Sequence, residues 1–363
     1  MTGPLQILAL EPFYSGSRRL MLETLQRRSR HHWTLLKLPG RRIERRLEAA
    51  AQWFAEVILR RPPMQFDLLF TSEAINLPEL FAACPELSGH PTVVYFHENQ
   101  LPVPGCGMER PVDHVNLLTA NDATENWFNT LYHLRQFSGR AAALARWAPH
   151  LFPPGVLERV TARSVLVTPP VELEAVSDIE RSAGLRRDRA AIFVDLRRAD
   201  VELLTAGLDV LKRRGASFTV VAIGSRNSLP ERFAVSYIHD QDEDGATFAM
   251  ARCGVYLSAD TDCPFDPRAV MALASGMRAA LPNAGAYPEI VPSSAHDATL
   301  YNPHPDFLAS LVQDLWALPE LTGWYEDLRA GVRHYDAESA VSTIDWRLAT
   351  VVEQYRTAMR PPA

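Results

Sequence analysis

PTVVYFHENQ, residues 91–100, is the stretch of this chain that decides its fold. The unbroken apolar run at 93–96 is typical of a strand buried on both faces of a parallel sheet. Ligands of open α/β sheets bind just beyond the carboxyl ends of the strands, so polar residues placed there are candidates for a site. The alternative interpretation is a polar loop that caps a buried strand. The polar residues that follow this run are His97, Glu98, Asn99 and Gln100.

Strand and helix patterns alternate along the rest of the chain, which predicts doubly wound parallel sheets. In the first half, strands are expected at 5–10, 33–38, 66–72, 92–96, 127–130 and 164–168. In the second half, they are expected at 191–195, 218–224, 237–238, 255–258 and 278–281. Helices are expected, among other places, at 41–61, 116–126, 247–253 and 344–359.

The length of 363 residues favours two domains, because about 100–200 residues per domain is usual. We therefore predict an α/β fold with two Rossmann-like, doubly wound domains. The N-terminal domain is placed at 1–172 and the C-terminal domain at 173–343, and a final helical segment occupies 344–363.

The composition, 47% hydrophobic and 22% charged, is that of a soluble globular protein. We find no run near the ~20 apolar residues that cross a bilayer and no signal-peptide pattern, so no membrane partner is expected. The cysteines at 84, 106, 253 and 263 lack the close spacing of a metal site. Reduced thiols, a cytoplasmic location and no bound metal are therefore expected.

Positive charge is concentrated near the N-terminus. The formal net charge is −6, yet residues 18–61 hold twelve Arg and Lys against four Glu, a local balance of +8. The helix expected at 41–61 begins with cations that oppose its dipole, so something other than helix stability should favour them. This pattern indicates docking of an anionic partner, with a solvated arginine-rich face as the alternative. The cations are Arg41, Arg42, Arg45 and Arg46.

Two further segments carry candidate site residues. Gly16, Ser17 and Arg18 belong to a turn of small residues after the first strand, where the backbone can approach a ligand. Asn129 ends the strand expected at 127–130, and His133 lies on the helix after it. Both can face the same site as His97, although a single histidine in such a place is more often structural.

Several of these segments resemble one known family. LALEPFYSGSRR, FDLLFTSEAINLPEL, VVYFHENQLPVP and WFNTLYH, with GMRAALPNAGAYPEIVP in the second half, resemble the tRNA-queuosine mannosyltransferase-like glycosyltransferases. That family has the GT-B fold, two Rossmann-like domains facing across a cleft, and is related to retaining glycosyltransferase family four. The resemblance implies mannosyl transfer from GDP-mannose to queuosine in tRNA, with retention and without a metal. It also implies that the last helix crosses back to the N-terminal domain.

The resemblance also assigns roles to residues. It implies that His97, with Glu98, lines the sugar pocket and takes part in catalysis. On the acceptor side it adds Gly16, Ser17, Arg18, Asn99, Gln100, Asn129, His133 and the four arginines Arg41, Arg42, Arg45 and Arg46. On the donor side it indicates Asn283, Tyr287 and Glu289. Arg197, Arg198 and Arg226 are candidates to replace the family's phosphate ligands, from which the chain departs.

The chain departs from the family pattern in its second half. Two glutamates of the family correspond to Cys263 and Met271, and the family's Asn-His-Arg-Trp corresponds to residues 194–197, VDLR. A lost ribose-binding carboxylate predicts that GDP-mannose binds at least ~10-fold more weakly than in a relative with both acids. Two other functions stay open. One is a non-catalytic relative that binds tRNA or another partner, and the other is a transferase with a different donor and a small-molecule acceptor.

Overall fold

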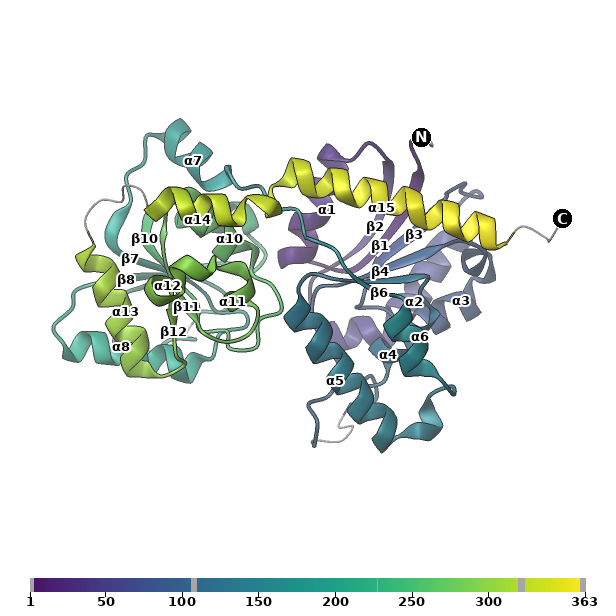
Figure 1. The fold of residues 1–363 in the computed structure, drawn as a ribbon, viewed down its shortest axis with the longest axis horizontal. Helices are drawn as coiled ribbons and strands as arrows, with labels where there is room; N and C mark the ends of the chain where they lie inside the picture. Colours follow the sequence, from purple (N-terminus) through teal and green to yellow (C-terminus); the bar gives the residue numbers. More distant parts are fainter. Residues whose placement is uncertain (1–2, 106–109, 227, 319–323, 360–363) are drawn as a thin grey trace. The chain divides into compact units, whose positions relative to one another are not determined.

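A computed structural model describes residues 3–105, 110–226, 228–318 and 324–359 (Figure 1). The chain divides into two compact units. The N-terminal unit comprises 1–170 and 338–363, and the C-terminal unit comprises 171–337. Each unit has a six-stranded sheet in which the paired strands are parallel, so the predicted α/β class with two Rossmann-like units is confirmed. Among the described helices, none combines the length and apolar character that crossing a bilayer requires.

The N-terminal sheet has the strand order β2-β1-β3-β4-β5-β6. The chain passes from β1 to β2 on one side and then returns to β3 on the other. The topological switch point, where ligands bind in such sheets, therefore lies between the ends of β1 and β3. In that order, the strands are His32–Pro39, Gln6–Tyr14, Leu68–Ser72, Thr92–Phe96, Glu125–Phe128 and Ser164–Leu166.

Helices cover both faces of this sheet. One face packs against α1 (Gly16–Arg28) and α15 (Ala337–Ala358), through residues such as Leu25 and Leu348. The helices of the opposite face are α2 (Ile43–Leu59), α3 (Leu77–Ala83), α4 (Val115–Asp122), α5 (Leu131–Trp147) and α6 (Val156–Ala162).

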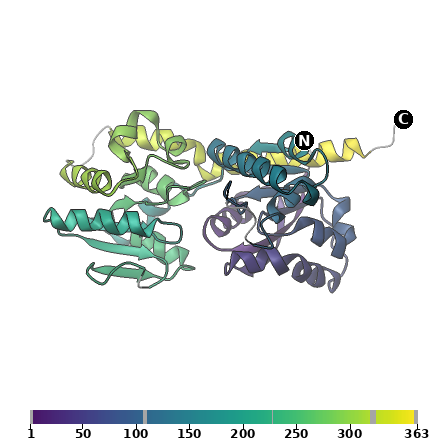
Figure 2. The same cartoon turned by 90° about the horizontal axis from the view of Figure 1, so that it is seen from below.

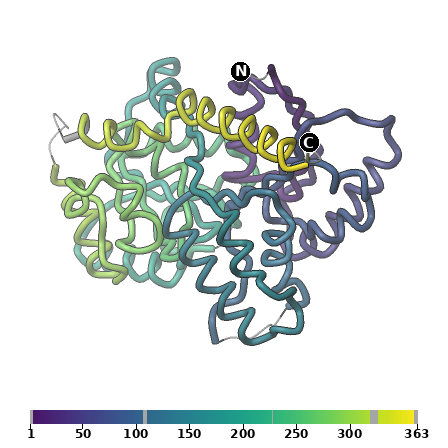
Figure 3. Tube along the Cα trace, turned by 45° about the vertical axis from the view of Figure 1, so that its right-hand side comes forward, coloured from purple at the N-terminus to yellow at the C-terminus, as the bar shows by residue number. Residues whose placement is uncertain are grey.

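Helix α15 is anchored to the N-terminal unit by polar contacts as well as by its apolar side. The Asp345 carboxylate accepts from the Ser29 hydroxyl at 2.5 Å and from the Arg30 backbone N–H at 2.8 Å. Arg347 donates two hydrogen bonds to Glu125, at 2.6 and 2.9 Å. The yellow helix runs along this unit in Figures 2 and 3. It begins at Ala337, seven residues before the expected start at 344.

The C-terminal sheet has the strand order β12-β11-β10-β7-β8-β9, with its switch point between β10 and β7. In that order, the strands are Leu300–Tyr301, Arg278–Pro282, Cys253–Leu257, Asp188–Asp195, Thr219–Ile223 and Val235–Ile238. Helices α8 (Val201–Arg213) and α13 (Pro305–Ala317) share one apolar cluster with this sheet. The other helices are α7 (Ala175–Ala183), α9 (Glu243–Met250), α10 (Pro267–Ser275), α11 (Tyr287–Ile290), α12 (His296–Thr299) and α14 (Trp324–Val332).

Three expected boundaries are wrong for local reasons. Strand β1 runs to Tyr14, which pairs with Pro39 of β2, so the turn of small residues is shorter than expected. The helix expected at 116–126 ends at Asp122, because the residues from Glu125 on pair with β4. The helix expected at 247–253 begins at Glu243, because the Asp242 side chain accepts from the Gly245 N–H and caps it.

Candidate active site

The N-terminal switch point is occupied by a buried ion pair. Arg18, in the first turns of α1, donates to Glu73, which directly follows β3. Their side chains are 3% and 0% exposed, so both charges are held away from solvent. Burial raises the pKa of Glu73, and the Arg18 guanidinium opposes that shift. This pair joins the turn after β1 to the end of β3.

Glu73 also holds the polar segment that follows β4. Its Oε2 accepts from the His97 backbone N–H and its Oε1 from the Glu98 backbone N–H, both at 3.1 Å. The Glu98 carboxylate lies 3.5 Å from Arg18 Nη2. The structure thus brings Arg18, His97 and Glu98 together around one carboxylate. Glu73 did not enter the sequence predictions, although its position, an acid immediately after a buried strand in FTSE, resembles that of His97.

His97 is buried but retains its hydrogen-bonding capacity. It is 5% exposed, and its ring centroid lies 4.7 Å from that of Tyr95. Within the described part of the chain, no hydrogen bond to the imidazole nitrogens is found. Burial, and then the positive charge of Arg18, lower the pKa of His97 well below its usual 6.5. The imidazole is therefore neutral near pH 7, when one ring nitrogen donates and the other accepts.

The neighbouring polar residues shape this loop. Asn129 donates to the His97 carbonyl at 3.3 Å and binds the His133 Nδ1 at 2.9 Å. His133 is fully buried, so it acts on the loop through Asn129. Gln100 donates to Glu98 at 3.1 Å, and Asn99 accepts from the backbone N–H of Leu101 at 3.0 Å, closing a turn.

The arginine-rich segment reaches the rim of this site at one end. Gly40 packs so closely on Ser15, the N-cap of α1, that a side chain at Gly40 would collide with it. Arg41 and Arg42 follow and are exposed to solvent. They were expected to lie within the helix, but α2 begins only at Ile43. Arg42 has a left-handed φ of 54°, unusual for a residue with a side chain.

The remaining basic residues do not form one surface. Arg45 is exposed and pairs with Glu48 at 3.0 Å, and Arg46 donates back to the Pro39 carbonyl at 2.9 Å. Helix α1, with its terminal Arg27 and Arg28, packs on the opposite face of the sheet from α2. The balance of +8 in the sequence is therefore divided between two faces of the unit.

Glu11 is a second buried carboxyl beside this ion pair. It is 2% exposed and accepts from the Phe13 N–H at 2.7 Å and the Ser72 hydroxyl at 3.0 Å. Burial raises the pKa of Glu11 to about 7, although the Arg18 charge opposes the shift. The carboxyl is thus largely protonated in the folded protein below neutral pH.

This elevation predicts a pH-dependent effect of Glu11→Gln. Because the folded-state pKa lies above the unfolded one, the stability that protonated Glu11 contributes is complete below about pH 4.5 and is lost as pH rises to about 7. Glutamine mimics the protonated form. We expect Glu11→Gln to be nearly neutral at pH 5 and to raise the free energy of unfolding by roughly 1–3 kcal/mol at pH 8. Urea unfolding at both pH values measures this, and equal effects at both would contradict it.

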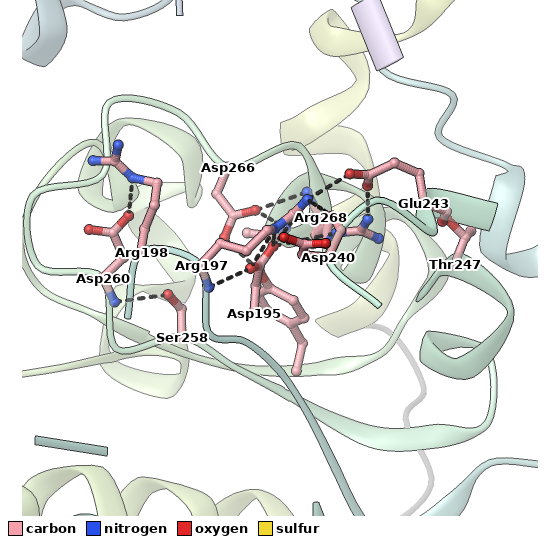
Figure 4. A network of polar contacts seen from close by, with 12 residues as sticks. Asp195, Arg197, Arg198, Asp240, Glu243, Thr247, Ser258, Asp260, Asp266 and Arg268 are labelled. Atoms are coloured by element: carbon pink, nitrogen blue, oxygen red, sulfur yellow. Dashed lines mark hydrogen bonds and ion pairs between the residues drawn. The ribbon is translucent and has the colours of Figure 1, made fainter. Parts of the chain in front are cut away.

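In the C-terminal unit, Arg197 and Arg198 follow β7 at the switch point. Figure 4 shows both arginines with the carboxylates that they contact. Arg197 donates from Nε to Asp195 Oδ1 at 2.9 Å and from Nη1 to Glu243 at 2.6 Å. Arg198 donates from Nε to Asp260 at 2.8 Å. Both arginines are therefore engaged with carboxylates of their own unit.

The other residues indicated for donor binding are scattered. Arg226 is exposed in the loop after β8, and Asn283 and Glu289 are exposed after β11. Tyr287 is fully buried, and its hydroxyl donates to Asp266 at 3.0 Å and lies 2.6 Å from the Ser258 hydroxyl. The structure thus brings Arg197 and Arg198 to one place, whereas Tyr287 serves the interior of the unit.

The two positions that replace the family's acids are both buried. Cys263 and Met271 are each 4% exposed. Burial, and then the charges of Asp260 and Asp266, raise the pKa of the Cys263 thiol well above its usual range. Cys84, Cys253 and Cys263 are free thiols, and Cys106 lies outside the described residues.

Solved structures share this architecture over nearly the whole chain. Sucrose-phosphate synthase from Thermosynechococcus elongatus superposes with a TM-score of 0.61 at 15% identity, over 97% of this chain and 100% of that one. The α,α-trehalose 6-phosphate synthase from Burkholderia multivorans gives a TM-score of 0.67 at 14% identity, over 99% of each chain. Together with the two parallel sheets, these similarities define the GT-B fold of glycosyltransferase-type proteins.

The N-terminal half is similar to one family in sequence. Residues 6–171 match the family model for the N-terminal domain of tRNA-queuosine alpha-mannosyltransferase. The tRNA-queuosine alpha-mannosyltransferase of Drosophila melanogaster is 36% identical over 99 residues, which are 27% of this chain and 26% of that protein. The aligned region thus spans about a quarter of this relative's length. Residues 6–171 are thus similar to the N-terminal domain of this family, and the resemblance seen in the sequence is confirmed.

Proposed function

We propose that this glycosyltransferase-type protein transfers mannose from GDP-mannose to queuosine in tRNA, with retention at the anomeric carbon and without a metal. The observation that carries the proposal is the cluster of His97, Glu98, Arg18 and Glu73 at the switch point of the matching domain. A cytoplasmic location, where tRNA is available, is part of the proposal.

The chemistry of the cluster suits glycosyl transfer. The transition state of such a reaction has oxocarbenium character, and positive charge placed beside it would oppose catalysis. His97 is held neutral, so it can bind a sugar hydroxyl without adding charge. Arg18, the nearby cation, is already paired with Glu73 and lies close to Glu98.

The arginines at the rim of the site are proposed to bind the tRNA backbone. Arg41 and Arg42 are exposed beside the turn after β1, at the strand ends where His97 also lies. Guanidinium groups bind phosphates through charge-assisted hydrogen bonds and fix the position of a nucleic acid. Arg46 is not part of this proposed phosphate contact, because it donates to the Pro39 carbonyl within the unit.

We expect the double variant Arg41→Glu with Arg42→Glu to weaken tRNA binding and to flatten its salt dependence. Each lost phosphate contact removes roughly one unit of the slope of log K against log salt. Arg60→Glu with Arg61→Glu is the matched control, since both arginines are exposed at the opposite end of α2. Filter binding at several salt concentrations measures the slopes. Equal slopes for both variants would indicate a general charge effect and contradict the assignment.

A second candidate function is a non-catalytic tRNA- or partner-binding relative. The observation in its favour is that Arg197 and Arg198 are paired with carboxylates, while Cys263 and Met271 offer no carboxylate to a ribose. A transferase that uses another donor and a small acceptor is the third possibility.

A thermal-shift panel of nucleotide-sugars, followed by calorimetry, separates these functions. A ligand of the folded state stabilises it by RT ln(1 + [L]/Kd), so the donor should raise the melting temperature with concentration. Selective stabilisation by GDP-mannose supports the main proposal. Stabilisation by another nucleotide-sugar supports the third candidate, and stabilisation by none supports the non-catalytic one.

A further inference from the structure

The arginine side chains at the switch point of the C-terminal unit are paired with carboxylates. Arg197 contacts Asp195 and Glu243, Arg198 contacts Asp260, and Arg268 contacts Glu243. The Arg268 Nε also lies 3.7 Å from Asp195 Oδ2. Figure 4 shows Asp195, Glu243 and the two arginines 197 and 268 gathered in one network. Three guanidinium groups are thus paired with three carboxylates, and a fourth carboxylate, Asp266, accepts from the Arg268 backbone N–H beside them.

The network has a buried part and an accessible part. The side chains of Glu243 and Arg268 are 1% and 2% exposed. Those of Asp195 and Arg197 are each 23% exposed, so they form the part that a ligand can reach. The Arg197 Nε donates to the two carboxylate oxygens of Asp195, at 2.9 and 3.2 Å. The Arg197 Nη2 donates to Asp195 Oδ2 at 2.5 Å. The Nε and Nη2 donors of Arg197 are therefore both directed at the Asp195 carboxylate.

We infer that Asp195 is a specificity-determining residue, because it competes with the phosphate groups of a nucleotide for Arg197. The inference rests on the proposed function, in which this unit binds the nucleotide-sugar. A diphosphate is best held by guanidinium groups through paired, charge-assisted hydrogen bonds. Asp195 provides the same geometry from within the protein. A diphosphate therefore binds only when Arg197 leaves Asp195, and its negative charge meets that of Asp195 as it does so.

The competition lowers affinity for any ligand that carries phosphate groups and leaves uncharged ligands unaffected. Arg198 cannot substitute without a similar exchange, because Asp260 accepts from it at 2.8 Å. Removing the charge of Asp195 leaves Arg197 paired with Glu243 and takes one negative charge from the network. Guanosine, GDP and inorganic pyrophosphate are suitable probes, since they separate the nucleoside from the phosphates.

Calorimetry on the full-length chain and on Asp195→Asn tests this inference. We expect Asp195→Asn to bind GDP and pyrophosphate at least ~10-fold more tightly, and guanosine with unchanged affinity. Asp195→Glu, which keeps the carboxylate, is expected to show no such gain, so a gain in both variants would contradict the inference. Asp209→Asn is the matched control, because it removes the same charge from α8, where Asp209 pairs with Arg232.

Unchanged or weaker GDP binding by Asp195→Asn overturns the inference, as does an equal gain in Asp209→Asn, which would show a general charge effect. Failure of the inference can be told apart from failure of the proposed function. A chain that transfers mannose, but whose Asp195→Asn variant binds GDP no more tightly, overturns the inference alone. A chain that transfers nothing, while Asp195→Asn tightens GDP and pyrophosphate binding, retains the inference and overturns the proposed function.

Discussion

His97→Ala is expected to lower the rate of sugar transfer at least 100-fold while leaving the fold intact. The expected loss corresponds to removing one positioned hydrogen-bonding group from a reaction centre, typically ~10²–10⁴-fold in rate. The fold should persist because Glu73 binds the backbone N–H of residue 97, which alanine retains. Steady-state turnover and thermal unfolding of the same preparation measure the two effects.

His90→Ala is the matched control for this variant. His90 lies just before β4 and His97 just after it, so the two histidines lie at opposite ends of the same strand. We expect His90→Ala to keep its turnover. Full turnover by His97→Ala on the true substrate would contradict the assignment of His97.

The second large effect is expected on stability. Glu243→Leu leaves Arg268, which is 2% exposed, beside Asp195 at 3.7 Å as its remaining carboxylate partner among the described residues. An arginine cannot release its proton to avoid the cost of burial. Removing one partner of a buried ion pair typically costs about 3–5 kcal/mol, so we expect a loss of this size in the unfolding free energy of the C-terminal unit.

Guanidinium chloride unfolding followed by near-UV circular dichroism measures this loss. The double variant Glu243→Leu with Arg268→Leu is expected to recover part of it, because no uncompensated charge remains on residue 268. Asp178→Asn, which removes an exposed partner of Arg181 in the same unit, should leave the midpoint unchanged. A midpoint for Glu243→Leu equal to that of Asp178→Asn would show that the buried network does not hold the unit together.

The sequence predicted the fold where a local pattern determines it. Strand β4 has the expected bounds, Thr92–Phe96, because a continuous apolar run between a proline and a polar segment leaves little choice of ends. The polar segment 97–100 also lies beyond the carboxyl end of this strand, as expected for a ligand site of a parallel sheet. Boundaries that depend on capping or on strand pairing were displaced by a few residues, as at Asp122 and Glu243.

The partners of the site residues could not be predicted in the same way. Glu73 lies 55 residues from Arg18, and Glu243 lies 25 residues from Arg268. Such pairs depend on which strand ends meet, and no local spacing records that. The sequence offered Arg18 and Arg197 as candidate ligand-binding residues, but it carried no information on the carboxylates that each of them contacts.

The buried position of Cys263 also bears on the replacement of a family glutamate by this cysteine. A glutamate placed there would stand beside Asp260 and Asp266, whose charges already act on the thiol. Burying a further carboxylate among them costs free energy. Restoring glutamates at 263 and 271 tests donor binding only if the double variant keeps its folding midpoint, which must be measured first.

The most direct test of the central proposal is transfer of radiolabelled mannose from GDP-mannose to tRNA by the unaltered chain. The acceptors are tRNA that carries queuosine and the same tRNA with guanosine at that position. We predict label in the queuosine-containing tRNA alone, and its loss when His97 is replaced by alanine. No label in either tRNA, at saturating donor and with a folded protein, would contradict the account.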